Sequence, residues 1–411
     1  MDTLTKNYIS KQLLEHSKIS PLEYFLTFLF VVCCGFTSGD VIPGKSYIII
    51  FFGLIFMLKH NKEFASKWFT LFIMIIPMSL ILLVHRKMFG KWDTSLKICI
   101  QLSIAGFFLI VMLKEKFKEA YFNIMTFISI ISLFFFALMV VTDYVPNIDS
   151  LNTGSIYKGI FIWNARLGEI ENKRNCGPFW EPGAFAGYIL MVFILYFNEW
   201  RYLWTFHRMK TIVLLLALIT TFSSQGYISA FLLIGAHLLK TVSHRNLIKI
   251  SIASIVSISL ILVLYNSLPF LKEKVEEQLE LTESWDSDQS LQSANRFTTT
   301  MVDIYNIQER PLTGSSSDSY ILYADFPFII NVVNQAGGYG SGSGMTVYMA
   351  QHGLVIFLIW LIMTLKSLIL YYGRKRTAIL VILVLLALGQ GEFYITYIMY
   401  QSLPYLKFAK H

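Results

Sequence analysis

Residues 120–142 read AYFNIMTFISIISLFFFALMVVT, an apolar stretch without a single charged side chain. A helix needs about 20 predominantly apolar residues to cross the hydrocarbon core of a bilayer, and this stretch reaches that length. The whole chain has 411 residues, of which 55% are hydrophobic and only 15% are charged. Soluble domains carry about 25% charged residues, so the low charge of the chain is typical of a membrane protein. The length of the stretch 120–142 then predicts a transmembrane helix.

Similar apolar runs follow one another along most of the chain. We expect an all-α polytopic membrane protein with about 12 transmembrane helices, because a helix satisfies its own backbone hydrogen bonds in lipid. Several runs are shorter than ~20 residues, so the pairs 211–239 and 377–405 could instead be re-entrant or tilted hairpins. The runs are residues 23–36, 43–57, 68–84, 97–113, 120–142, 184–198, 211–222, 227–239, 249–266, 343–363, 377–389 and 392–405.

The runs divide the chain into five parts. Helices 1–5 are expected in residues 1–142, helices 6–9 in residues 184–266 and helices 10–12 in residues 343–411. The segments between them, 143–183 and 267–342, are too long to be simple connections, and loops beyond ~15 residues are commonly functional. We expect both segments to form large loops on the outer side of the membrane.

The distribution of charge sets the expected orientation. The chain holds 34 Lys and Arg against 26 Asp and Glu, for a net charge of +8. Because the excess lies in alternate short loops, the positive-inside rule predicts an inner N-terminus. One loop predicted to be outer is an exception, because it contains Arg86, Lys87 and Lys91. The segment 267–342 is acidic instead. The basic excess therefore indicates topology and argues against a nucleic-acid partner.

The first group of candidate catalytic residues is Arg166, Glu169, Arg174 and Glu181. They precede a hydrophobic helix that Pro182 is suited to begin. A helix N-terminus beside an arginine favours an anionic phosphate, and a partly desolvated carboxylate is suited to act as a general base. The alternative is structural: a glutamate that complements the helix dipole, and arginines that meet lipid headgroups.

Three other features have both a functional and a structural interpretation. Arg296 and Arg310, in the acidic loop, either form salt bridges or bind a ligand. The turn Ser223-Ser224-Gln225-Gly226 either lines a polar cavity or simply joins two helices. His352 is either functional, as membrane histidines often are, or a hydrogen-bonded packing residue.

Neither a metal nor a cofactor is expected. The sequence contains no HExxH motif, no Cys/His cluster and no phosphate-binding Walker A loop. Its four cysteines, Cys33, Cys34, Cys99 and Cys176, form no disulfide framework and no CxxC metal motif.

Residues Arg174-x-x-Gly177-x-Phe179-x-Glu181-Pro182, followed by Ala186 in a helix, resemble a signature of the O-antigen polymerase and O-antigen ligase superfamily. The turn Thr220–Gly226 is similar to the family's Thr-x-Ser-Arg-Gly turn, with Gln225 at the place of the arginine. Arg296 followed by Arg310-Pro311-Leu312-Thr313-Gly314 resembles the Arg…Pro-x-x-Gly pattern of the family's large outer loop. The resemblance covers residues 160–360, approximately.

The resemblance implies a GT-C-like membrane glycosyltransferase that polymerises undecaprenyl-pyrophosphate-linked oligosaccharide repeat units into O-antigen or capsule. It implies the bacterial inner membrane, an active site on the periplasmic face, and lipid-linked glycans as both donor and acceptor. A chain-length regulator and a flippase of the same pathway are the implied partners.

Two alternatives to the polymerase stay open. An O-antigen ligase would transfer the finished glycan to lipid A core, but the ligases' His-Asn-like pair ahead of Gly353 is missing. A lipid-linked glycan transporter would use the same polyprenyl groove, and would be expected to show internal repeats or charged residues at mid-membrane.

The resemblance also implies roles for the candidate residues. Arg174 and Arg296, together with Arg166 and Arg310, are expected to bind the donor pyrophosphate, for which the planar guanidinium is better suited than lysine. Glu181 is the expected catalytic base, and Glu169 is the second choice.

Overall fold

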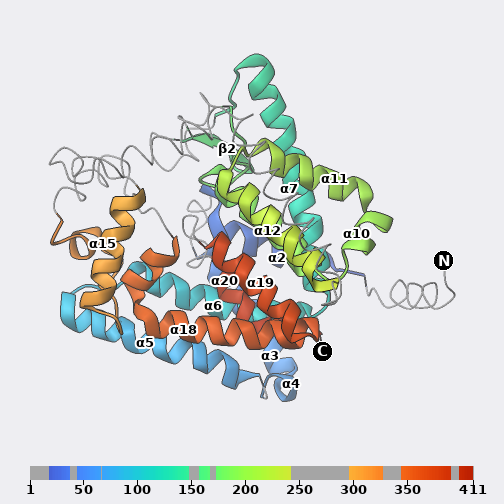
Figure 1. Ribbon diagram of the computed structural model, residues 1–411. Coiled ribbons are helices and arrows are strands. Elements are labelled where there is room, and N and C mark those ends of the chain that lie inside the picture. The colour runs from blue at the N-terminus through green and yellow to red at the C-terminus, as the bar shows by residue number, and fades with distance from the viewer. Residues whose placement is uncertain are drawn as a thin grey trace.

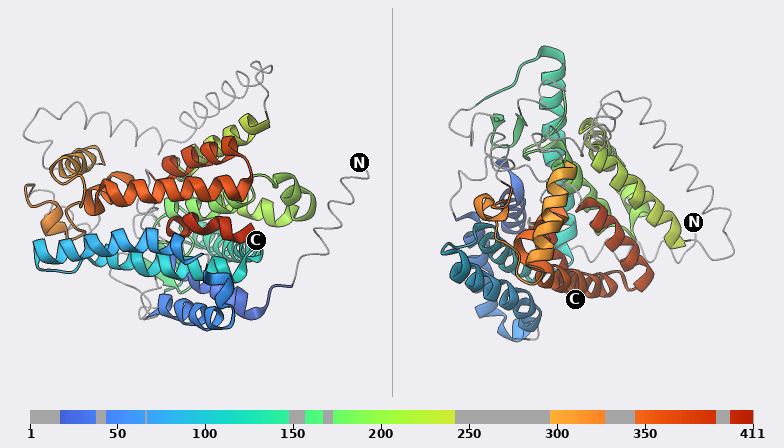
Figure 2. Two further views of the ribbon diagram at one scale, coloured as in Figure 1. Left: turned by 90° about the horizontal axis from the view of Figure 1, so that it is seen from below. Right: turned by 60° about the vertical axis from the view of Figure 1, so that its left-hand side comes forward.

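The computed structural model describes residues 18–37, 44–65, 67–147, 157–166, 173–241, 296–326, 344–389 and 398–410. These residues form a helical bundle in which α5 (Trp68–Phe89) and α18 (Gly344–Tyr372) run side by side along one edge (Figure 1). The same two helices lie together when the molecule is turned by 90° (Figure 2). The predicted helix 249–266, and the predicted residue Glu169, lie outside the described residues.

Most of the other helices overlap predicted apolar runs, whereas those at 61–65, 200–206, 296–309 and 319–322 lie between the runs. Of the predicted run 392–405, residues 392–397 lie outside the described residues. In chain order they are α2 (Pro21–Gly35), α3 (Lys45–Lys59), α4 (Asn61–Ala65), α6 (Thr94–Leu113), α7 (Lys116–Thr142), α9 (Pro182–Leu195), α10 (Trp200–Phe206), α11 (Arg208–Thr220), α12 (Ser224–Thr241), α15 (Arg296–Glu309), α16 (Ser319–Leu322), α19 (Lys375–Leu388), α20 (Ile398–Ser402) and the 3-10 helix η6 (Leu403–Lys410).

The fold is helical and apolar, as predicted for a multi-pass membrane protein. Within the described residues, α5, α6, α7 and α18 are long and apolar enough to cross a membrane. The pair α9 and α10 makes a fifth candidate span, bent by 99°. The twelve spans and the GT-C-like arrangement stay predictions. α5 exposes Phe69, Phe72, Ile76, Leu80 and Leu83 along one face, an apolar stripe suited to contact lipid.

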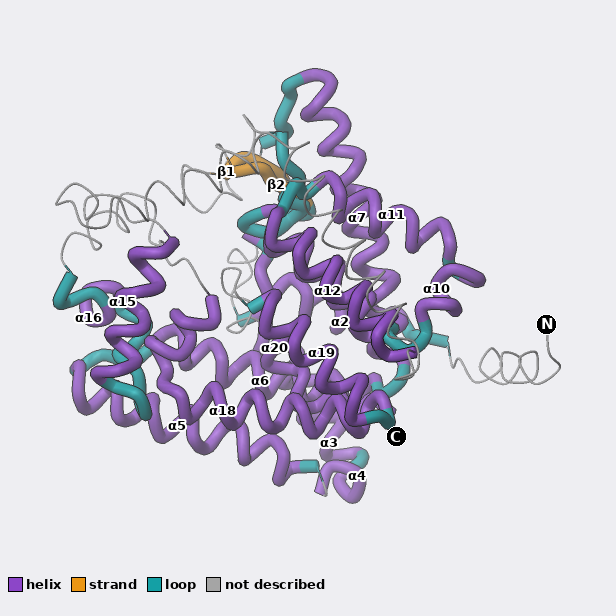
Figure 3. The backbone as a smooth tube through the Cα atoms, in the orientation of Figure 1, coloured by secondary structure: helices purple, strands orange, loops and turns teal. Residues whose placement is uncertain are grey.

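The segment 143–183 differs from a plain loop. It holds a hairpin of β1 (Tyr157–Ile160) and β2 (Trp163–Arg166), which are antiparallel and the only strands among the described residues (Figure 3). Trp163 is fully buried and stacks on Phe135 of α7, with ring centroids 5.5 Å apart. The hairpin is therefore attached to the bundle by a tertiary contact that the local sequence does not show.

Contacts between loops agree with the predicted alternation of sides. Among the loops predicted to be inner, Lys118 pairs with Glu199 at 2.7 Å, and Asn198 donates to the Tyr372 carbonyl at 3.3 Å. Among the loops predicted to be outer, the Thr37 amide donates to the Pro178 carbonyl at 3.1 Å.

The loop 85–95, which is predicted to be outer although it is basic, contacts the acidic segment 267–342. Lys91 pairs with Asp318 at 3.0 Å. An acidic segment on the same side thus compensates at least one of the positive charges that the rule places elsewhere.

Candidate functional site

The start of α9 brings together two segments that the sequence analysis singled out separately. Glu181 is the N-cap residue of α9, and Pro182 occupies the first turn. A β carbon added to Gly183 would lie 3.1 Å from Glu181 Oε1 and 3.3 Å from Ser223 Oγ. The carboxylate of the first segment and the hydroxyl of the second are therefore neighbours. We call Arg174, Asn175, Glu181 and Ser223 the α9 site.

Arg174 contacts the two residues that directly precede Ser223. Its Nη2 donates to the Phe222 carbonyl at 3.1 Å, and its Nε lies 3.4 Å from the Thr221 carbonyl. Both carbonyls lie just beyond the C-terminal end of α11, where a cation also complements the helix dipole. The guanidinium is half-buried. These two contacts orient the plane of the guanidinium.

Asn175 holds the segment in position and was not among the predicted site residues. It is fully buried. Its side-chain oxygen accepts from Ser132 Oγ at 2.5 Å and from the Gly177 amide at 3.1 Å, while its Nδ2 donates to Thr220 Oγ1 at 2.9 Å. One side chain thus joins α7, the end of α11 and the turn that leads to Glu181.

The turn at Ser223 has the structural role that was one of its two interpretations. The Gly226 amide donates to Ser223 Oγ at 3.1 Å, which caps the start of α12. A β carbon on Gly226 would lie 2.5 Å from the Ala186 Cβ, so the glycine lets α12 approach α9 closely. Gln225 donates to the Ala387 carbonyl at the end of α19. Capping does not exclude a second role, because it leaves Ser223 beside Glu181.

Of the remaining predicted arginines, Arg166 and Arg296 have a described backbone, and Arg310 also has a described side chain. Arg166 ends β2 opposite Tyr157, and Arg296 begins α15; the side chains of both lie outside the described residues. Arg310 stacks over the Phe89 ring at the end of α5, 5.1 Å from its centroid. Its surroundings are therefore those of α5 rather than of the α9 site, and its role in pyrophosphate binding stays a prediction.

A second group of polar residues surrounds a break in α18. Gly353 has φ +84°, which interrupts the helix, and residues 311–317 fill the interruption. The Ser315 and Ser316 amides donate to the Ala350 and Gln351 carbonyls at 2.8 Å and 3.0 Å. We call residues 311–317 the insert. It supplies hydrogen bonds that the broken helix cannot make for itself.

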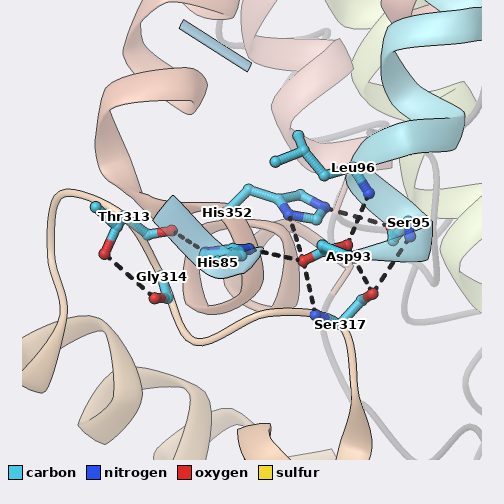
Figure 4. A network of polar contacts seen from close by, with 8 residues as sticks. All are labelled: His85, Asp93, Ser95, Leu96, Thr313, Gly314, Ser317 and His352. Carbon is cyan, nitrogen blue, oxygen red and sulfur yellow. Dashed lines mark hydrogen bonds and ion pairs between the residues drawn. The ribbon is translucent and has the colours of Figure 1, made fainter. Parts of the chain in front are cut away.

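Buried side chains hold the insert against α5 and α6 (Figure 4). Asp93 caps α6 through the Leu96 amide at 2.8 Å and accepts from both the amide and the hydroxyl of Ser317, at 2.9 Å and 2.7 Å. His85 Nδ1 lies 3.0 Å from Asp93 Oδ2, and its Nε2 lies 2.8 Å from the Thr313 carbonyl. We call His85, Asp93, Ser95, Ser317 and His352 the helix-break cluster.

Charge in the helix-break cluster is balanced internally. Both ring nitrogens of His85 face acceptors, so His85 donates twice and is a cation when Asp93 is ionised. Burial by itself raises the pKa of the Asp93 carboxyl. The hydrogen bond from His85, the charge that His352 carries in acid, and the donors Leu96 and Ser317 outweigh burial and hold this pKa well below its ordinary value.

His352 completes the cluster and was noted in the sequence without an assigned role. It is fully buried; its Nε2 lies 3.3 Å from Ser95 Oγ, and its Nδ1 lies 3.8 Å from Asp93 Oδ2 without a hydrogen-bond partner. This order of serine, histidine and aspartate is that of a hydrolase triad. However, the Ser95 amide donates to Ser317 Oγ and the Leu96 amide to Asp93, so neither is available to stabilise an oxyanion.

His85 and Asp93 were not predicted, although one signal pointed to them. Both are ionisable residues beside an apolar run, and such residues in membrane proteins commonly face the protein interior. Their partners in the insert, Thr313 and Ser317, lie more than 200 positions away, so no local pattern could connect them. Among the described residues, no group of three His, Cys, Asp or Glu side chains is arranged to hold a metal ion.

No protein-family model, curated protein or solved structure matches the chain.

Proposed function

We propose that the chain is a membrane glycosyltransferase that polymerises polyprenyl-pyrophosphate-linked oligosaccharides. The observation that supports this best is the convergence of Arg174, Glu181 and Ser223 at the start of α9. A pyrophosphate needs a fixed cation, and an acceptor hydroxyl needs a base within hydrogen-bond reach. The α9 site offers both kinds of group at one end of an apolar bundle that could hold a polyprenyl chain.

In the proposed reaction, Glu181 takes the proton of the acceptor sugar hydroxyl as its oxygen attacks the anomeric carbon of the donor. The bond between that carbon and the phosphate oxygen breaks, and polyprenyl pyrophosphate leaves. Arg174 offsets the negative charge that develops on the leaving group, which is the main electrostatic contribution required of the protein. Ser223, beside Glu181, is suited to orient the carboxylate or the acceptor hydroxyl.

The finer parts of the proposal come from the resemblance of the sequence motifs. They are about 12 spans in a GT-C-like arrangement, undecaprenyl pyrophosphate as the lipid carrier, and an active site on the periplasmic face of a bacterial inner membrane. Arg166, Arg296 and Arg310 are proposed as additional pyrophosphate ligands and Glu169 as a second acid–base group. Proposed partners are a chain-length regulator and a flippase.

The test is polymer formation in liposomes from purified protein and undecaprenyl-pyrophosphate-linked oligosaccharide. We expect the unsubstituted protein to produce a ladder of lipid-linked polymers. Arg174→Ala and Glu181→Gln should abolish the ladder while leaving the protein folded by size-exclusion chromatography and thermal unfolding.

Two matched controls separate chemistry from general loss of charge. Lys173 is the neighbour of Arg174 and pairs with Asp143 at 2.9 Å, away from the α9 site. Glu199 pairs with Lys118 in a loop predicted to lie on the other side of the membrane. Lys173→Ala and Glu199→Gln should both keep the ladder. A ladder that survives in Arg174→Ala and Glu181→Gln would contradict the proposed mechanism.

A lipid-linked glycan transporter is the second candidate, and the helix-break cluster is the observation that favours it. Broken membrane helices and buried ionisable residues are recurrent features of proton-coupled carriers. Liposomes distinguish the candidates: movement of labelled lipid-linked oligosaccharide between leaflets without any elongation would support the transporter. Transfer of preformed polymer to added lipid A core would instead identify a ligase.

A further inference from the structure

We propose that His352 is a proton-binding site, and that its protonation releases the insert, residues 311–317, from the break in α18. This inference concerns the helix-break cluster alone and does not rest on glycosyl transfer. The ligand is the proton, and the response is a change in how an outer-loop segment is attached to the membrane helices.

The insert is attached by few, identifiable hydrogen bonds. On α18 they are the bonds of Ser315 and Ser316 described above, with a third from the Leu354 amide to the Pro311 carbonyl at 2.8 Å. On the other side, Asp93 accepts twice from Ser317, and His85 donates to Thr313. Two ionisable side chains therefore hold the insert directly, so a change in their charge acts on its attachment.

A proton on His352 disturbs these two side chains. With His352 neutral, the charges of Asp93 and His85 cancel. Protonation adds a second positive charge to a fully buried site that has one carboxylate. It also gives Nδ1 a proton that faces Asp93 Oδ2, an oxygen that already accepts from His85 and from the Ser317 amide. Competition for this oxygen weakens the bonds that hold the insert.

The groups around His352 offer no second carboxylate to absorb that charge. α5 contributes His85, the α5–α6 turn contributes Asp93, and α6 contributes Ser95 and the Cys99 thiol. Tyr348, one turn earlier on α18, meets the His352 ring edge to face at 4.9 Å. The next carboxylates are engaged elsewhere: Asp318 pairs with Lys91, and Asp303 accepts from Thr346. These statements hold for the described residues.

If opening of the cluster is coupled to binding of a proton at His352, the opening equilibrium depends on pH. Below the ordinary histidine pKa of ~6.5, the opening equilibrium should rise by about tenfold for each pH unit. Acid should therefore favour the released insert and neutral pH the attached one.

Cysteine labelling of the full-length protein in liposomes tests this directly. Ser315 is 2% exposed, whereas Leu312, in the same insert, is 64% exposed. Ser315→Cys and Leu312→Cys proteins are treated with a membrane-impermeant maleimide between pH 8 and pH 5, and modification of each peptide is read by mass spectrometry. The ratio of labelling at position 315 to labelling at position 312 removes the intrinsic effect of pH on thiol reactivity.

We expect the ratio to rise about tenfold or more between pH 8 and pH 5, and to stay flat when His352→Gln is added. His207→Gln is the matched control, because His207 contacts Tyr202 in a loop predicted to lie on the other side of the membrane; it should leave the rise intact. A flat ratio in the protein that keeps His352, or an equal rise in His352→Gln, overturns the proposal.

A second measurement covers the case in which His352→Gln does not fold. Hydrogen exchange at the Ser315 and Ser316 amides, corrected for intrinsic rates, reports the same bonds in the unsubstituted protein. Protection that is lost on acidification below pH ~6.5 supports release, and protection that persists to pH 5 overturns it.

Discussion

The α9 site and the helix-break cluster both join loops on the same predicted side of the bundle, but they use charge differently. In the helix-break cluster, Asp93, His85 and His352 are at most 1% exposed and interact with one another. In the α9 site, Arg174 and Glu181 are half-buried, and the guanidinium donates to neutral carbonyls. Buried ionisable groups that interact with one another serve attachment and respond to protons, whereas partly exposed groups can be reached by a ligand.

The largest effect should come from neutralising the carboxylate of the helix-break cluster. Asp93→Asn leaves the buried His85 cation without its counter-charge and weakens the cap of α6. Breaking a buried pair from one side costs about 3–5 kcal/mol, so we expect loss of folded protein or a large fall in thermal stability. If Asp93→Asn unfolds at the same temperature as the unsubstituted protein, the helix-break cluster does not stabilise the fold.

The stability that Asp93 contributes to the folded protein should depend on pH in a definite direction. Because the pKa of Asp93 is lowered in the folded protein, its contribution to stability is fully present above its ordinary pKa, ~3.9. It is lost as the pH falls further, since the unfolded chain then binds the proton more readily. Thermal unfolding should show this acid loss, separate from release of the insert at higher pH. Absence of the loss would contradict the strong His85–Asp93 interaction.

The next largest effect should come from the glycine at the break of α18. Gly353→Ala adds a β carbon that overlaps the Leu312 carbonyl, at a backbone φ of +84° that side chains rarely adopt. Backbone strain and overpacking each cost about 1–3 kcal/mol, so thermal unfolding should shift strongly.

A matched glycine separates packing from helix propensity. A β carbon on Gly235, in α12, would meet nothing within 4 Å. Gly235→Ala should be neutral or stabilise by up to ~1 kcal/mol, since alanine favours the helix. Equal losses at both glycines would show that the insert does not fill the break.

Much of the bundle could be predicted, because apolar runs such as 120–142 show helices without any tertiary information. The run 68–84 was predicted too short: α5 continues to Phe89, because Arg86 and Lys87 suit a helix C-terminus that Gly90 then ends. The approach of residues 174–183 to the Ser223 turn was not predicted, because the sequence analysis interpreted the two segments separately. The helix-break cluster could not be predicted, because its parts come from three distant segments: residues 85–95, Ser317 and His352.

A smaller effect on stability, but a clear one on activity, is expected at the α9 site. Arg174→Lys keeps the positive charge but loses the planar donor geometry that contacts two carbonyls and suits a pyrophosphate. Polymer formation in liposomes should fall by roughly 10-fold to 100-fold, which corresponds to ~1.4–2.8 kcal/mol in activation free energy. Lys173→Ala should change neither activity nor folding. Full activity in Arg174→Lys would mean that any cation suffices there.

The smallest effect should come from the exposed ion pair at the edge of the helix-break cluster. Lys91 and Asp318 lie 3.0 Å apart, but the Lys91 side chain is 67% exposed, so water and salt screen the pair. Removing it with Lys91→Ala should change stability by less than ~1 kcal/mol, and by still less at high salt. The same Asp318 is next in sequence to Ser317, whose bonds to Asp93 are buried. Thermal unfolding of Lys91→Ala and Asp93→Asn therefore compares an exposed and a buried attachment of one segment. If the exposed pair contributed as much as the buried one, surface charge would hold the insert, and a proton on His352 could not release it.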